Sequence, residues 1–188
     1  MTDSLQRVIV WRNLPAEGTD YCSLWRTAQG WLLNGTAIAA VSESGPVLAH
    51  YRVRCDSAWR TQSVGVELTQ KDQIRLLQLL RNEAAEWKTA ERVPPEITGC
   101  IDADLAITPA TNILPIRPLN IPIGRSREVT AGWIKFPELS VAPLPQHYRR
   151  LSNEIYRYES GNNFCAEIAV DDMGFVVSYQ NAGQRIVA

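Results

Sequence analysis

The feature that most constrains the fold of this chain is a two-residue alternation of apolar and polar side chains. In PVLAHYRVRCD, residues 46–56, polar side chains alternate with the apolar ones of Val47, Ala49, Tyr51, Val53 and Cys55. Successive side chains of a β-strand point to opposite faces, so this pattern predicts a strand with one buried and one solvated face. The segments before and after it are also strand-like, and residues 20–70 are therefore predicted to form an antiparallel meander.

Further strands are predicted at residues 128–136, 147–159, 164–170 and 175–179. SESGP, residues 42–46, is predicted to connect two strands of a hairpin, because glycine and proline are typical of turns. The sequence thus predicts a mainly β protein, and its 188 residues fit one domain spanning 1–188.

One segment departs from the strand pattern. QIRLLQLLRNEAAEW, residues 73–87, places apolar side chains at three- or four-residue spacing and is rich in Leu, Gln, Glu and Ala. This spacing and composition, taken alone, predict a helix.

The charge and cysteine content of the sequence limit which binding partners and which cellular compartment are expected. The 19 basic and 20 acidic residues give a net charge of −1, which supplies no broad attraction to nucleic acid or to an anionic membrane. The apolar run at 8–11 is too short for a signal peptide or a membrane span. Four widely spaced cysteines, without a C-x-x-C pair, indicate buried reduced thiols and a cytoplasmic protein.

Several cofactor and catalytic motifs are missing from the sequence. It contains no G-x-G-x-x-G, phosphate-binding loop, G-x-S-x-G or H-E-x-x-H motif, and its two histidines are far apart. No cofactor and no metal site is expected.

The segment TPATNILPIRPL, residues 108–119, cannot be a paired strand because proline lacks the N–H group that a ladder requires. Thr108 can cap a helix whose first residue is Pro109. A single helical turn is expected before Pro115 disturbs it.

Asp102 and Asp104 precede this segment and, on a strand, would project from one face roughly 6–7 Å apart. Two such carboxylates can divide acid and base work, as in glycoside hydrolases. They can equally serve as structural ion-pair partners, for example of Arg117, whose planar side chain suits carboxylates. The structural interpretation is favoured, because buried carboxylates are usually paired.

Aromatic residues form a second candidate group. Trp59, Trp133, Tyr156 and Tyr158 could stack on a sugar or line an apolar cleft, or they could fill the core of a sheet. Within HYRRLSNEIYRYES, the tyrosines share one face of the predicted strand and two arginines lie on the other.

Three stretches together, CIDADLAITPATNILPIRPL, YRVRCDSAWRTQSVGV and YRYES followed by AEIAVDDMGFVVSY, resemble a bacterial glycolipid-binding family of spurious β-roll proteins. The resemblance covers nearly the whole chain. It implies a curved, mostly antiparallel sheet, a β-roll or half-barrel, around the short helical, proline-rich segment. It also implies that residues 73–80 are a strand, and we adopt this prediction over the helical one.

Ten positions from Asp102 to Arg117 match the motifs of the family. Trp59 and Tyr158 match in the other two stretches. In the family a second arginine commonly follows the first, but Pro118 stands there in this chain. An anion clamp made of two arginines is therefore not expected.

These observations predict a protein that binds a glycolipid or another lipid. Its acyl chain would lie in the concave face, and Asp102, Asp104, Asn112 and Arg117 would contact the polar head group. The alternatives are a hydrolase or isomerase that uses the Asp102 and Asp104 pair, and a structural or interaction module with a filled roll and no ligand.

Overall fold

The structure is a computed structural model that describes every residue except 1, 14–16, 42–44, 83, 85 and 90–96. The mainly β prediction is confirmed, because the described elements are strands apart from one 3₁₀ turn and one short helix. The N-terminal strands are β1 (Ser4–Asn13), β2 (Gly18–Thr27), β3 (Gly30–Val41), β4 (Gly45–Cys55), β5 (Thr61–Gln70), β6 (Gln73–Arg81) and β7 (Trp87–Lys88). The remaining elements are β8 (Asp102–Leu105), the 3₁₀ turn Pro109–Asn112, α1 (Ile113–Leu119), β9 (Ser126–Ile134), β10 (Val141–Arg150), β11 (Ile155–Ser160), β12 (Phe164–Val170), β13 (Val176–Tyr179) and β14 (Gly183–Val187).

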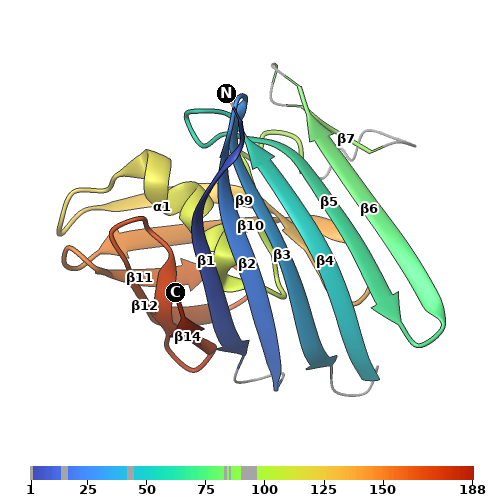
Figure 1. The fold of residues 1–188 in the computed structure, drawn as a ribbon. Helices are drawn as coiled ribbons and strands as arrows, with labels where there is room; N and C mark the ends of the chain where they lie inside the picture. The colour runs from blue at the N-terminus through green and yellow to red at the C-terminus, as the bar shows by residue number, and fades with distance from the viewer. Residues whose placement is uncertain (1, 14–16, 42–44, 83, 85, 90–96) are drawn as a thin grey trace.

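The fourteen strands of the described residues belong to one curved, open sheet in the order β7-β6-β5-β4-β3-β2-β1-β14-β13-β12-β11-β10-β9-β8. Neighbouring strands are antiparallel except β8 and β9, which are parallel. The first and last strands therefore pair in the middle of the sheet, with β7 and β8 at its two ends. Figure 1 shows the blue to green N-terminal strands in front, the orange to red C-terminal strands behind, and the proline-rich segment between them.

The N-terminal half, β1–β7, confirms the predicted meander, because its strands are neighbours in the order of the sequence. In β4 the five apolar residues of the alternating pattern are buried, and His50, Arg52 and Arg54 are exposed. The inner face of this half is filled mainly by aliphatic side chains such as Leu33, Leu68 and Leu79. Burial of these side chains provides most of the driving force for folding.

Within the segment 73–87, where the local pattern alone predicts a helix, residues 73–81 form a strand. Gln73–Arg81 is β6 and pairs with β5 along its length, as the family resemblance implies. Leu79 is buried, whereas Ile74 and Leu76 are exposed on the other face. Pairing with a formed neighbour thus decides the conformation against the helical propensity of leucine and glutamine.

The single strand predicted at 147–159 is wrong, because two strands, β10 and β11, share this region. A turn separates them, in which the N–H of Leu151 donates to the carbonyl of Ile155 at 2.8 Å. Tyr148 pairs with Tyr158 across the hairpin, so the tyrosines still share one face. The missed signal is Ser152 and Asn153, two turn-forming residues between the two strand-like runs.

Two smaller predictions have different outcomes. The strands β3 and β4 pair as a hairpin, and residues 42–44 of the predicted SESGP connection lie outside the described residues. Three cysteines are buried as predicted, but Cys165 is exposed on the outer face of β12. The alternation in β12 explains this, since Ala166 and Ile168 face inward.

The proline-rich segment packs between the two halves of the sheet. The hydroxyl of Thr108 accepts the N–H of Ala110 at 3.0 Å, which confirms the predicted cap. The helix continues through Pro115, contrary to the prediction, because a first-turn residue has no helical partner for its N–H anyway. Ile113 and Leu114 join the N-terminal core, and Ile116 joins a separate C-terminal cluster that contains three tyrosines.

Candidate functional site

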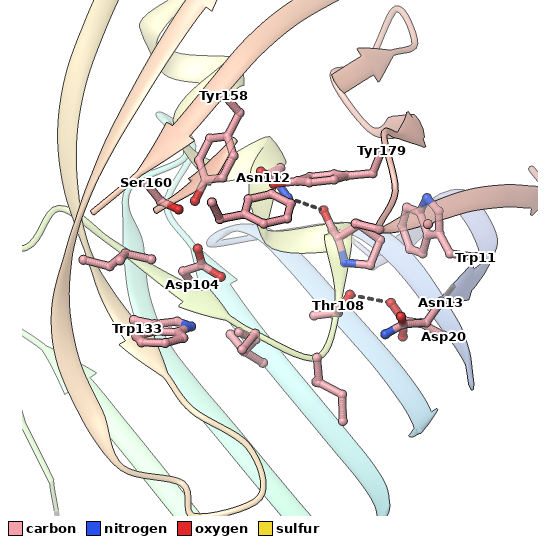
Figure 2. Close-up of a pocket in the computed structure, with 18 of the residues that line it drawn as sticks. Trp11, Asn13, Asp20, Asp104, Thr108, Asn112, Trp133, Tyr158, Ser160 and Tyr179 are labelled. Carbon is pink, nitrogen blue, oxygen red and sulfur yellow. Dashed lines mark hydrogen bonds between the residues drawn. The ribbon is translucent and has the colours of Figure 1, made fainter. Parts of the chain in front are cut away.

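A cavity of about 360 Å³ lies where the two halves of the sheet meet. Its walls come from β1 and β2, from β8 to β14, and from the start of the proline-rich segment. Figure 2 places Asp104 and Trp133 toward one end of this cavity and Trp11, Asn13 and Asp20 toward the other, with Tyr158 and Tyr179 beside Asn112. Its volume is within the range of small-molecule sites.

The structure brings together only half of the sequence-predicted site residues. Asp104, Asn112, Trp133 and Tyr158 line the cavity. Asp102, Arg117, Trp59 and Tyr156 lie outside it and have other contacts, described below.

Asp104 is half-buried on β8, where parallel pairing sets it opposite Trp133 of β9. The side-chain amide of Gln146 donates a hydrogen bond of 2.5 Å to its carboxylate. Burial raises the pKa of Asp104 from its usual 3.8 to about 6, and the hydrogen bond only partly opposes this shift. Asp104 is thus a carboxylate beside an open cavity that can gain or lose a proton near neutral pH.

Asp102 is buried deeper, outside the cavity. Its carboxylate accepts a hydrogen bond from the hydroxyl of Thr61 at 2.9 Å. Burial raises its pKa to about 6 against the effect of this bond. Asp102 and Asp104 both border a small enclosed space of about 10 Å³, as expected of residues on one face of β8.

The proposed pairing of Arg117 with these aspartates is wrong. The Arg117 side chain is exposed, donates to the backbone carbonyl of Asp172 at 3.3 Å, and lies 6.0 Å from the centre of the Trp59 ring. The donors to the two aspartates are Thr61 and Gln146, which are neutral. The carboxylates are therefore stabilised mainly by the uncharged dipoles of their neighbours, and the charge of Arg81 adds a smaller stabilisation of Asp102.

Trp59 lies in the turn between β4 and β5 and is buried against Trp31. The two rings are stacked with centroids 4.6 Å apart. Its φ of +67° is unusual for a bulky residue, and the Asp56 carboxylate holds the turn by accepting the N–H groups of Ala58 and Arg60. Trp59 is thus a packing residue at the edge of the core, outside the cavity.

The two tyrosines of β11 have different surroundings. Tyr156 is buried in the C-terminal cluster, and the Arg150 guanidinium lies 5.6 Å from its ring centre. Tyr158 contacts the rings of Tyr179 and Phe164 at centroid distances of 6.1 and 6.2 Å, and these rings are 5.7 Å apart. Tyr158, Phe164 and Tyr179, which we call the aromatic wall, line one side of the cavity.

Sequence reasoning missed Asp20, which is buried on β2 and lines the cavity. Thr108 donates a short hydrogen bond to its carboxylate, and the Tyr51 hydroxyl donates another at 3.0 Å. Burial raises the pKa of Asp20 to about 7, against the effect of both bonds. The sequence did contain an indication of this position. Asp20 is two residues from the inward-facing Cys22 on the same strand, so its side chain points to the same face.

Gly35 of β3 makes this arrangement possible. Tyr51 extends from β4 across β3 toward Asp20 on β2. A Cβ atom at Gly35 would lie 2.2 Å from Cζ of the Tyr51 ring, so only glycine leaves room for the tyrosine.

Two negative findings concern the described part of the chain. It contains no group of three or more His, Cys, Asp and Glu side chains that could hold a metal ion. None of its helices is long and apolar enough to cross a membrane.

Comparison with known proteins places the chain in a family. The family described as "putative glycolipid-binding" matches residues 8–185, nearly the whole chain. The chain belongs to this family. The crystal structure of a DUF1089 family protein from Pseudomonas aeruginosa is similar, with a TM-score of 0.80, 30% sequence identity, and 89% of this chain and 92% of that chain covered. No curated protein sequence matches significantly. The bacterial family identified from the sequence motifs is thus confirmed, together with its curved sheet.

Proposed function

We propose that this chain binds a glycolipid and holds its sugar head group in the cavity between the two halves of the sheet. The observation that supports this most is the combination of aromatic rings with hydrogen-bonding side chains along one cavity wall. Sugars are bound by stacking on aromatic faces and by side chains such as Asp and Asn that pair with hydroxyl groups. Trp133, the aromatic wall, Asp104 and Asn112 supply both kinds of contact.

The size of the cavity limits how much of the ligand it encloses. At about 360 Å³ it is near the lower end of ligand sites, and it suits a sugar ring with the first part of an alkyl chain. The inner face of the N-terminal half is filled mainly by its own aliphatic side chains, so we propose that the acyl chain lies elsewhere than on this part of the concave face. Leu144 and Ile107 offer apolar contact for the first methylenes inside the cavity.

The roles of the sequence-predicted residues are revised accordingly. Asp104, Asn112, Trp133 and Tyr158 are proposed to contact the ligand. Asp102 and Tyr156 are proposed to support the cavity from behind. Trp59, which stacks on Trp31, is assigned to packing, and Arg117 is proposed to contact only parts of a ligand that extend outside the cavity.

Titration with two alkyl glycosides that differ only in the head group tests the proposal. An alkyl glucoside should quench or shift tryptophan emission saturably, while an alcohol with the same alkyl chain should bind at least tenfold more weakly. Trp133→Ala should weaken binding of the glucoside by about fivefold, consistent with the loss of one stacking contact of about 1 kcal/mol. Trp59→Phe, outside the cavity, is the control and should bind as the wild type does. Equal binding of the glucoside and the alcohol would contradict recognition of the sugar.

A hydrolase remains the second candidate because Asp104 combines a raised pKa with an open cavity. Asp102 and Asp104 are less suited to act as a catalytic pair, since Asp102 lies outside the cavity. Turnover of chromogenic glycosides that is abolished in Asp104→Asn would establish the enzyme in place of the carrier.

Two coarser proposals complete the assignment. One sheet contains all fourteen strands, which supports a single domain over residues 1–188. The cysteines form no disulfide among the described residues, which supports a reducing compartment such as the cytoplasm.

A further inference from the structure

Two carboxylates line the candidate cavity, and both are held by uncharged partners. Asp20 accepts hydrogen bonds from Thr108 and Tyr51, and Asp104 accepts one from Gln146. None of the ion pairs formed within the described ranges of the chain includes either aspartate. Among the described residues, these two acidic groups of the cavity therefore have no ion-pair partner.

The other charged side chain of the cavity lining does not change this balance. Arg12 belongs to the lining, but it is exposed on β1, where water screens its charge. Asp20, by contrast, is 3% exposed. The enclosed part of the cavity is thus an acidic environment, and the field of its carboxylates is strengthened by the surrounding apolar side chains.

The aromatic rings of the lining add to the same preference. Tyr158, Phe164 and Tyr179 contact one another and line one side of the cavity. The Lys135 ammonium lies 4.8 Å from the centre of the Trp133 ring, so this ring already attracts a cation in the protein. Aromatic faces carry negative electrostatic potential and attract ammonium groups, most strongly where water is excluded.

We infer that the head group bound in this cavity carries a positively charged amine, as in a lipid with an amino-sugar head group. This inference rests on the proposed function and specifies the ligand class. An ammonium group would supply the counter-charge that Asp20 and Asp104 lack, and it would donate charge-assisted hydrogen bonds to at least one of them. Burial raises the pKa values of both groups, and an ammonium group bound beside them would lower these pKa values by favouring the charged carboxylates.

The test compares an alkyl glucosaminide that has a free amine with its N-acetylated counterpart, using the full chain at pH 7. The two ligands share the ring and the alkyl chain and differ in charge. The amine should bind about 10- to 100-fold more tightly, which corresponds to the 1.5–3 kcal/mol typical of hydrogen bonds to charged groups. Calorimetric titration measures both affinities directly.

Matched variants identify the responsible carboxylate. Asp104→Asn should reduce the ratio of the amine affinity to the N-acetyl affinity by about tenfold, and this ratio is the readout because the variant also removes a sugar contact that both ligands share. Asp102→Asn removes a carboxylate from the same strand, outside the cavity, and should leave the preference intact. Unfolding midpoints of both variants show that each is folded in the assay.

The outcomes separate the two proposals. Equal binding of the amine and the N-acetylated ligand would overturn the amine inference while leaving glycolipid binding in place. An amine preference that survives Asp104→Asn and also Asp20→Asn would overturn the role of these carboxylates. If neither ligand binds, the proposed function fails first, and the inference fails with it.

Discussion

The two halves of the sheet have the same alternating strands but use their inner faces differently. In β2–β6 the inward side chains are mainly aliphatic, and together with Ile113 and Leu114 of α1 they fill the concave face. In β8–β14 the inward residues include tyrosines and polar groups, and a cavity remains against β1 and β2. One half thus supports the structure, and the other half, which the same pattern builds, provides a candidate site.

The difference shows why a strand pattern alone does not locate a site. Alternation determines which residues point inward, but it does not determine whether another element covers them. Here the short proline-rich segment reaches both halves and fills only one completely. The chemical identity of the inward residues is the better indicator of function, because the filled core is mostly aliphatic, whereas the cavity is lined by aromatic rings and by Asp20 and Asp104.

The largest expected effect is on the stability of the filled half. Leu68 is fully buried in the core, and Leu68→Ala should lower the free energy of unfolding by about 2–5 kcal/mol because it leaves a void. Leu144→Ala enlarges a cavity that already exists, so its cost should be smaller, about 1–2 kcal/mol for the lost burial alone. Denaturant titration measures both, and equal losses would remove the distinction between the halves.

The next effect is a pH dependence that originates at Asp20. Its pKa is about 7 in the folded protein and near 3.8 when unfolded, so the folded state binds the proton more tightly. Stability therefore falls as the pH rises from about 4 to about 7. Asp20→Asn should reduce the loss of stability between pH 5 and pH 8 by about 2–3 kcal/mol. Identical pH profiles for the variant and the wild type would mean that Asp20 is solvated like a surface group.

A third prediction concerns the close approach of Tyr51 to β3. Gly35→Ala should lower the free energy of unfolding by about 1–3 kcal/mol, because the new methyl group would overlap the Tyr51 ring. Gly65→Ala in β5 is the control, since no atom lies within 4 Å of its Cβ position, and it should be nearly neutral. Thermal unfolding of both variants is sufficient, and a neutral Gly35→Ala would show that the tyrosine can move away from Asp20 at little cost.

The smallest effect is expected at Arg117. Its contacts are a backbone carbonyl and a ring 6.0 Å away, both near the surface, so Arg117→Ala should cost less than about 1 kcal/mol. This value replaces the larger loss that pairing with Asp102 or Asp104 would have produced. A loss above 3 kcal/mol in denaturant titration would contradict the exposed position of the side chain.

Much of the fold was predictable from the sequence because it depends on short-range patterns. Alternation located the meander at 20–70, and Thr108 with Pro109 marked the start of the helical segment. Strand β6 was predictable only through the family resemblance, because its leucines have helical spacing and its conformation depends on β5. Non-local pairing leaves no periodic signal of its own.

The candidate site was predictable in part, for a related reason. Asp104 and Asn112 lie in the conspicuous proline-rich region, and they do line the cavity. Asp20 lies 88 residues from its hydrogen-bond partner Thr108, and no local motif connects them. The pairing of Arg117 with the aspartates was predicted only from their opposite charges. The sequence does not show to which side of α1 the Arg117 side chain points.

The pairing of β1 with β14 has a consequence for how the chain folds. Most neighbouring strands in the sheet are also neighbours in sequence, so their loops close at low entropic cost, whereas Val10 meets Val187 only after nearly the whole chain is in place. Such a late contact is expected to limit the folding rate. The cavity has walls from both sides of this junction, so a ligand can bind only chains that have completed it. Ligand binding would then select the fully closed molecule and protect it against opening at the place where its two ends meet.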